Sequence, residues 1–147
     1  MPDYDAIAVA LAARYAGGVT TPPKPAGLTD IRTSTADIPN TAPRGPCVLV
    51  FTDRGTLAGG NQTRIGLATY RVQFLLREGV DLARDESQLR RWLGVLVNRL
   101  APAFCTLGGL VSRCEVAGWT LGAIRFAGKL YSGIELVVNA RTDEAWS

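Results

Sequence analysis

The chain has 147 residues, of which 47% are hydrophobic and 20% charged, and its formal net charge is +3. This length suits one domain with a buried core, and the hydrophobic content is too high for a disordered chain. The sequence contains no histidine, which excludes Ser-His-Asp and Cys-His catalysis and most catalytic zinc sites.

The first predicted element is a helix over about residues 3–16. Asp3 is placed to cap this helix, and Gly17-Gly18 would end it. One face carries apolar side chains at four-residue steps, which is the spacing of a buried helical stripe. These residues are Ile7, Leu11 and Tyr15.

Residues 19–46 are predicted as a proline-rich connector. Proline lacks a backbone N–H and fixes φ, so the prolines within 19–30 and 36–46 oppose regular helix or sheet pairing. A short strand at about 31–35 is expected between them. A stiff extended segment such as 19–30 could lie across a neighbouring subunit at little entropic cost.

The middle of the chain predicts two strands. "CVLVF" at 47–51 is apolar on both faces and therefore predicts a central strand. Residues 67–77 alternate between apolar and polar side chains, which is typical of a half-buried strand. Residues 52–66 are polar and glycine-rich, and we expect there a long loop or a projecting hairpin tip. The polar face of 67–77 carries Thr69, Arg71, Gln73 and Arg77.

A second helix is predicted over about residues 82–100, from an apolar stripe of Leu89, Trp92, Leu93, Leu96 and Leu100. Asp81 and Asp85 are both suitable caps, so the start stays open. The other faces carry Arg84, Asp85, Glu86, Arg90, Arg91 and Arg99. We expect Asp85 and Glu86 to be solvated surface residues.

Three strands are predicted at the C-terminal end, at about 110–119, 122–127 and 130–141, with a turn at Gly128-Lys129. The last strand has an apolar face and a polar face that includes Glu135, Asn139 and Arg141. The element order predicts a single α+β domain over 1–147. It contains one mostly antiparallel or mixed sheet packed against a long central helix plus the N-terminal helix.

No catalytic, cofactor or metal site is predicted. Cys47, Cys105 and Cys114 are odd in number and widely spaced, which predicts reduced, buried thiols. The N-terminal segment has the wrong charge order for a secretory signal, and its apolar runs are too short to cross a bilayer. We therefore expect a soluble cytoplasmic protein that is not an enzyme and that works through its surfaces.

Four stretches together resemble the tail terminator, or tail completion, proteins of long-tailed bacteriophages. They are "YDAIAVALAARYA", "STADIPNTAPRGPCVLVF", "YRVQFLLREGVDLARDESQLRRWLGVLVNRL" and "WTLGAIRFAGKLYSGIELVVNAR". The resemblance lies in the order and texture of the elements and covers most of the chain. It implies a virion protein, assembled in the host cytoplasm, that forms a usually hexameric ring at the head-proximal end of the tail tube.

The resemblance also implies partners: further copies of the chain, the major tail tube protein, a neck or stopper protein, and genomic DNA passing through the ring. Arg54, Asn61 and Arg64 are the candidate residues for contact with the tube or the lumen. The candidate subunit interface consists of Arg71, Gln73, Arg77, Glu135, Asn139 and Arg141. A plain solvated sheet face remains the alternative for these six residues.

Two other functions fit the same sequence features. A head-to-tail stopper or adaptor protein of the same connector has similar size and composition. A stand-alone nucleic-acid-binding α+β domain would need an aromatic-lined site. Tyr70, Phe74 and Trp119 are available for it, although their spacing predicts core positions.

Overall fold

The computed structural model describes residues 2–59, 63–101 and 106–145. In chain order the elements are α1 (Tyr4–Arg14), β1 (Thr33–Thr35), β2 (Cys47–Gly59), β3 (Thr63–Glu78), α2 (Leu82–Asn98), the short 3-10 helix η2 (Leu107–Gly109), β4 (Arg113–Phe126) and β5 (Lys129–Ala145). The fold is therefore α+β, as the sequence predicts. No helix within these ranges is both long and apolar enough to span a membrane.

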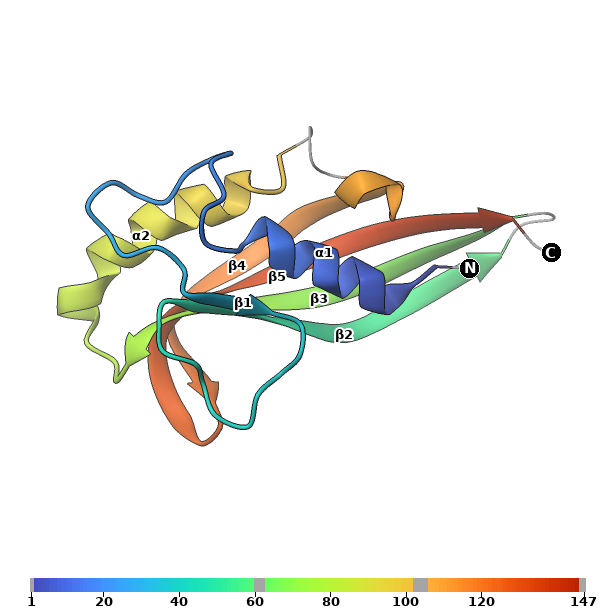
Figure 1. Ribbon diagram of the computed structural model, residues 1–147. Helices are drawn as coiled ribbons and strands as arrows, with labels where there is room; N and C mark the ends of the chain where they lie inside the picture. Colours follow the sequence, from blue (N-terminus) through green and yellow to red (C-terminus); the bar gives the residue numbers. More distant parts are fainter. Residues whose placement is uncertain (1, 60–62, 102–105, 146–147) are drawn as a thin grey trace.

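The strands form one mixed sheet in the order β1-β2-β3-β5-β4. β1 runs parallel to β2, and the other neighbours are antiparallel. Both α-helices cover the same face of this sheet (Figure 1). The central helix α2 is 17 residues long, which is shorter than the long helix that the sequence suggests.

The main core lies between the helices and this face of the sheet. The predicted stripe of the first helix is buried in it, because Ile7, Leu11 and Tyr15 are fully inaccessible. Of the second predicted stripe, Leu93 is partly buried, and the buried members are Leu89, Trp92, Leu96 and Leu100. The sheet contributes alternate residues of its central strands, as half-buried strands do. These are Tyr70, Val72 and Phe74 of β3 and Ile134, Leu136 and Val138 of β5. Phe74 packs against Trp92 of α2 with ring centroids 5.0 Å apart and ring planes tilted by 39°.

A smaller core lies on the opposite face of the sheet, at one end. It contains Cys47, Leu49, Leu75, Ile124 and Tyr131. The segment before β2 and the turn between β4 and β5 both lie on that side of the sheet (Figure 1). β2 is thus buried on both faces at its start, which confirms the expectation from "CVLVF". Burial raises the pKa of the Cys47 thiol to about 11, so the group stays protonated.

Of the two structures expected for 52–66, the prediction of a long loop is wrong and the prediction of a projecting hairpin is correct. β2 continues to Gly59, β3 begins at Thr63, and the two strands stay paired to Gly59 and Arg64. β5 accompanies β3 to the same end, where Thr63 pairs with Ala145. The three strands form an arm that extends beyond the helices (Figure 1). We define the arm as residues 52–59, 63–70 and 138–145. α1 covers one face of the inner half of the arm, where Ala68, Tyr70, Val138 and Ala140 are buried. The outer part of β2 is exposed, and polar and glycine residues are compatible with an exposed strand.

The C-terminal meander also differs from the prediction. The segments 110–119 and 122–127 belong largely to one strand, β4, which is interrupted only by a bulge between Val116 and Gly118. Phe126 pairs directly with Lys129, so the turn between β4 and β5 consists of Ala127 and Gly128. Both turn residues have positive φ. The predicted turn at Gly128-Lys129 is therefore one residue late. Two left-handed residues are what a tight type I′ hairpin requires.

Candidate interaction surface

The face of the sheet away from the helices is uncovered along the arm and the middle of the sheet. Directly paired residues in an antiparallel ladder point to the same face. The pairings therefore place Gln73 beside Glu135, Arg71 beside Val137, Thr69 beside Asn139 and Leu67 beside Arg141. Arg54 and Thr56 of β2 pair with Thr69 and Leu67 and extend the same surface. We call these ten residues the open face.

The centre of the open face is a network of hydrogen bonds and an ion pair between β3 and β5. Arg71 Nη2 lies 3.0 Å from Glu135 Oε1, and Gln73 Nε2 donates to Glu135 Oε2 at 2.9 Å. Thr69 Oγ1 donates to Asn139 Oδ1 at 3.1 Å. These contacts fix the side chains in place, so that a partner would meet an ordered polar surface.

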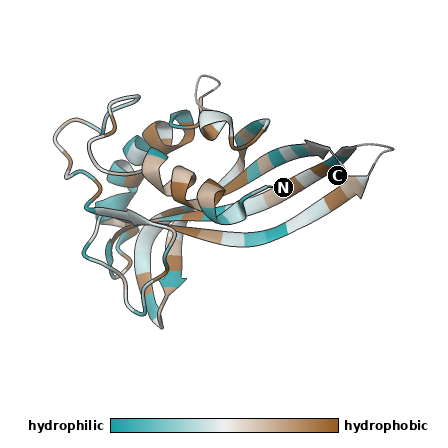
Figure 2. Cartoon of the chain, turned by 45° about the vertical axis from the view of Figure 1, so that its right-hand side comes forward, coloured by the Kyte–Doolittle hydropathy of each residue, from teal (hydrophilic) through white to brown (hydrophobic). Residues whose placement is uncertain are grey.

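Apolar groups lie beside this network. Leu67 is 42% exposed and Ile65, two residues earlier on the same side of β3, is 39% exposed. Arg141 Nε lies 3.2 Å from Asp143 Oδ1 at the outer end. Hydrophilic and hydrophobic residues alternate along the arm (Figure 2). Exposed leucine and isoleucine beside paired arginines are compatible with a contact surface for another protein.

Five of the six predicted interface residues lie on the open face, and Arg77 does not. A β-bulge between Leu75 and Arg77 shifts the register, so that Arg77 pairs with Ser132. A bulge adds one residue to one strand and so reverses the face of the next side chain. Arg77 consequently turns toward α2, where its Nη2 donates to Gln88 Oε1 at 3.1 Å.

Arg77 also reaches Asp85, which the sequence places wrongly on the solvated surface. Asp85 is fully buried, and Arg77 Nε lies 3.1 Å from its Oδ1. Arg84 donates to both carboxylate oxygens at 2.9 and 3.0 Å, and Ser132 Oγ lies 2.8 Å from Oδ2. The hydrogen bonds from Arg84, with those from Ser132 and the charge of Arg77, hold the pKa of Asp85 below its usual value against the opposing effect of burial. The helix cap is Asp81, whose side chain accepts from the Arg84 backbone N–H.

Arg99 is a second charged residue whose role the sequence does not reveal. It is fully buried at the end of α2, where its guanidinium stacks on Trp92 at 5.9 Å. Its N–H groups donate to the carbonyl oxygens of Pro22, Ala16 and Val19 at 3.2, 3.4 and 3.5 Å. Burial lowers its pKa, an effect that Asp30 partly offsets. Arg99 thus joins the start of the proline-rich connector to the core, a role that only the tertiary contacts reveal.

The three candidate residues for tube or lumen contact do not form one cluster. Arg54 is exposed on the open face, at the outer strand of the arm. Arg64 is five residues before Thr69 on β3, with no bulge between them, and therefore lies on the opposite face. Asn61 lies outside the described residues, as does Cys105; Cys47 and Cys114 are buried free thiols, as predicted.

An aromatic nucleic-acid site is not assembled from the residues available for it. Tyr70 and Phe74 are fully buried under the helices, as their spacing predicts, whereas Trp119 is 54% exposed. Burial raises the pKa of Tyr70 to about 12. Among the described residues, no group of three or more His, Cys, Asp or Glu side chains could hold a metal ion.

No model of a known protein family matches the chain, and no curated protein matches it significantly.

Proposed function

We propose that this chain is a structural subunit that assembles with its own copies into a ring. We further propose that the ring closes the head-proximal end of a bacteriophage tail tube, stops tube growth and joins the tail to the neck. The observation that carries the proposal is the open face, an ordered and partly apolar sheet surface with no helix over it. The resemblance of the sequence to tail terminator proteins supplies the biological setting.

A ring requires that one patch of each subunit fit a different patch of the next. The sheet offers suitable patches at its two sides. β1 pairs with β2 only from Cys47 to Leu49, so the outer edge of β2 beyond Leu49 has no neighbouring strand in the described part of the chain. β4 is the strand at the other side of the sheet. Unpaired strand edges are ready sites for another chain, and a protein that uses them in assembly does not need to cover them.

The arm gives each subunit reach beyond its own core. It presents Arg54, Leu67 and Arg141 away from the helices, where a tube protein or an adjacent subunit can contact them. Arginine forms charge-assisted, planar contacts and is enriched in protein interfaces. Genomic DNA passing through such a ring would meet few arginines, which suits sliding better than tight phosphate binding.

A stopper or adaptor subunit of the same head-to-tail connector would use a similar surface and is the second candidate. Tail length distinguishes the two functions. In a phage that encodes this chain, deletion of the gene should give tubes of irregular, excessive length if the chain terminates tails. Tails of normal length that fail to join heads would overturn the terminator proposal in favour of a stopper or adaptor. Normal infectious virions would overturn both.

A further inference from the structure

The two outer strands of the sheet each leave an edge uncovered. β1 pairs with β2 only from Cys47 to Leu49, so the rest of β2, from Val50 to Gly59, has no strand on its outer side in the described ranges. Within the same ranges β4 pairs with β5 alone. Backbone N–H and C=O groups on such edges are ready to pair with another chain.

The strand directions determine how a second copy would fit between these edges. β2 is antiparallel to β3, β3 to β5, and β5 to β4. Three reversals make β4 antiparallel to β2. A second copy placed beside the first in the same orientation therefore brings its β2 antiparallel to β4 of the first copy. The ladder then continues across the contact, and the open faces of both copies lie on the same side.

The pairings also align residues in rows that cross the whole sheet. Arg54 pairs with Thr69, Thr69 with Asn139, and Asn139 with Glu115. Directly paired residues point to the same face, so this row ends in Arg54 at one edge and Glu115 at the other, both on the side of the open face. The row next to it consists of Thr56, Leu67, Arg141 and Arg113. Rows that continue into a second copy place Glu115 of the first directly beside Arg54 of the second.

The charges at the two ends of this row are complementary. Arg54 is exposed and forms no ion pair or hydrogen bond with a described residue. The Glu115 side chain is 55% exposed, and its Oε2 accepts from Arg113 Nη2 at 3.0 Å. A carboxylate has two oxygens and can accept from a second arginine as well. Because the opposite charges lie on different edges, they favour contact between β4 and β2 over contact of one edge with itself.

β-Bulges limit where the two edges can pair. β2 has a bulge between Thr52 and Arg54, and β4 has one between Val116 and Gly118. A bulge bends an edge strand and interrupts its pairing. The segments Arg54–Gly59 and Arg113–Val116 lie on the arm side of these bulges and are regular. Both charged residues of the row belong to these regular segments.

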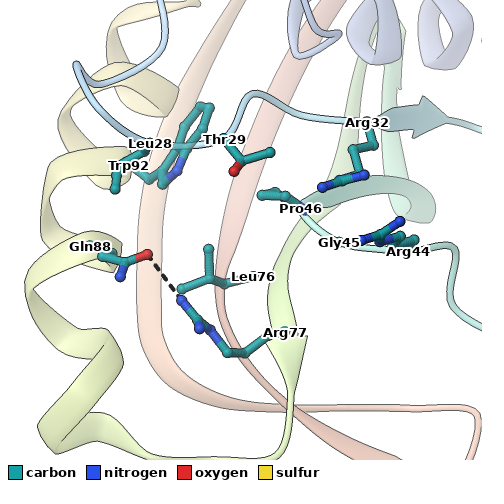
Figure 3. A pocket seen from close by; sticks show the side chains of 10 residues that line it. All are labelled: Leu28, Thr29, Arg32, Arg44, Gly45, Pro46, Leu76, Arg77, Gln88 and Trp92. Atoms are coloured by element: carbon teal, nitrogen blue, oxygen red, sulfur yellow. Dashed lines mark hydrogen bonds between the residues drawn. The ribbon is translucent and has the colours of Figure 1, made fainter.

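Other exposed arginines near β2 lie beside its covered stretch. Arg32 and Arg44 line a cavity of ≈ 240 Å³ that Gln88 and Trp92 of α2 also border (Figure 3). The backbone N–H of Arg32 donates to the carbonyl oxygen of Pro46, immediately before the part of β2 that β1 covers. Arg54 is thus the arginine of the uncovered edge.

We propose that β4 of one copy pairs antiparallel with the arm segment of β2 in a second copy, with Glu115 of the first beside Arg54 of the second. This inference rests on the proposed assembly of the chain with its own copies and assigns the contact that joins neighbouring subunits. Each subunit uses one edge on one side and the other edge on the other side. The contact is therefore heterologous and can be repeated around a ring.

The test exchanges the two charges and measures mass by sedimentation across a concentration series. Arg54→Glu and Glu115→Arg should each weaken self-association at least about tenfold, because each places like charges beside one another at every contact. An equimolar mixture of these two single variants should associate again. In an alternating order every contact of the mixture joins a glutamate to an arginine. The double variant should likewise recover association to within about threefold of the unmodified chain.

The exposed ion pair of α2 supplies matched controls. Arg90→Glu and Glu86→Arg make the same charge changes away from both edges and should leave association unchanged. Urea unfolding of all variants should confirm that the subunit fold is kept, since the four positions are exposed.

The outcomes separate this contact from the proposed function. A closed oligomer that persists in both single variants, or a mixture that fails to recover association, would overturn the β4–β2 contact and leave the proposed ring standing. A dimer that does not grow with concentration would indicate a twofold contact and overturn the inference as well. A monomer of the unmodified chain at every concentration would contradict both the contact and the ring.

Discussion

At the scale of single residues, the most informative side chains are charged groups buried against the sheet. Asp85 lies within α2 at a position that sequence patterns assign to the solvated surface. It is buried because β5 places Ser132 opposite it and the β3 bulge brings Arg77 to it. A carboxylate tolerates such a site only when donors surround it. Asp85 therefore fixes α2 to the end of the sheet.

Replacing Asp85 by Asn should destabilise the protein by roughly 1–3 kcal/mol at pH 7, the scale of hydrogen bonds to a charged group whose arginine partners are half-exposed. Because the pKa of Asp85 is lowered in the folded state, its contribution is present above the ordinary carboxyl pKa of about 3.9 and is lost as the pH falls through the lower folded-state value. Urea unfolding of both proteins should thus converge in acid. Glu86→Gln, at the exposed neighbouring position, is the control. A pH-independent difference would contradict this account.

Arg99 provides a second prediction at this scale. Arg99→Met keeps most of the apolar stem but leaves the carbonyl groups of Ala16, Val19 and Pro22 without their donor. We expect a loss of roughly 2–4 kcal/mol in the free energy of unfolding, measured in urea. Arg90→Met, on the exposed face of the same helix, should cost less than about 0.5 kcal/mol. Equal effects of the two substitutions would show that Arg99 does not hold the connector.

At the scale of elements, hydrophobic periodicity predicts the helices and most strands because those segments bury one face. The stripes of α1 and α2 and the alternation of β3 and β5 are buried as their spacing requires. The bulge after Leu75 cannot be predicted in this way, since a shift of one residue leaves the local composition unchanged. For 52–66 the sequence left a long loop and a projecting hairpin open for a related reason: the outer part of β2 is exposed, so its polar and glycine residues have a loop-like composition.

The same reasoning limits what could be predicted of the open face. Alternation alone places Arg71, Gln73, Glu135, Asn139 and Arg141 on the polar side of their strands, and the ladder confirms that side. The cross-strand network of Arg71, Gln73 and Glu135 depends on the register between β3 and β5. Strands this distant in sequence have no turn between them to fix that register.

The close approach of β3 and β5 gives a prediction at the scale of elements. A Cβ atom at Gly133 would run into the backbone oxygen of Phe74 and contact Cγ1 of Ile124. Gly133→Ala should therefore lower the free energy of unfolding by roughly 1–3 kcal/mol, as overpacking does. Gly118→Ala in β4 is the matched control, because nothing lies within 4 Å of its added Cβ. Urea unfolding of the two variants measures the difference, and a destabilised Gly118→Ala with an unaffected Gly133→Ala would contradict the packing described.

At the scale of the whole molecule, the sheet has one face under two helices and another that is largely open. The smaller core covers only one end of the second face. An ordered polar network beside exposed Leu67 and Ile65 gives the remainder the character of a contact surface. Association through this surface is the function proposed for the protein, and the helical layer covers the opposite face of the sheet.

Substitutions on the two faces should separate association from folding. Leu67→Asp introduces a charge on the open face at a position that is 42% exposed. We expect it to weaken self-association by at least about tenfold, while the free energy of unfolding of the subunit changes little. Val9→Asp is the matched control, because Val9 is 54% exposed on α1, in the helical layer. Equal loss of association in both variants would argue against the open face as the interface.

The most direct test of the central claim is the mass of the purified protein in solution across a concentration series. We predict a discrete closed oligomer, which is a hexamer in the proposed ring. This oligomer should be lost in Leu67→Asp and retained in Val9→Asp. A monomer at every concentration would contradict assembly of this chain into a ring through its own surfaces.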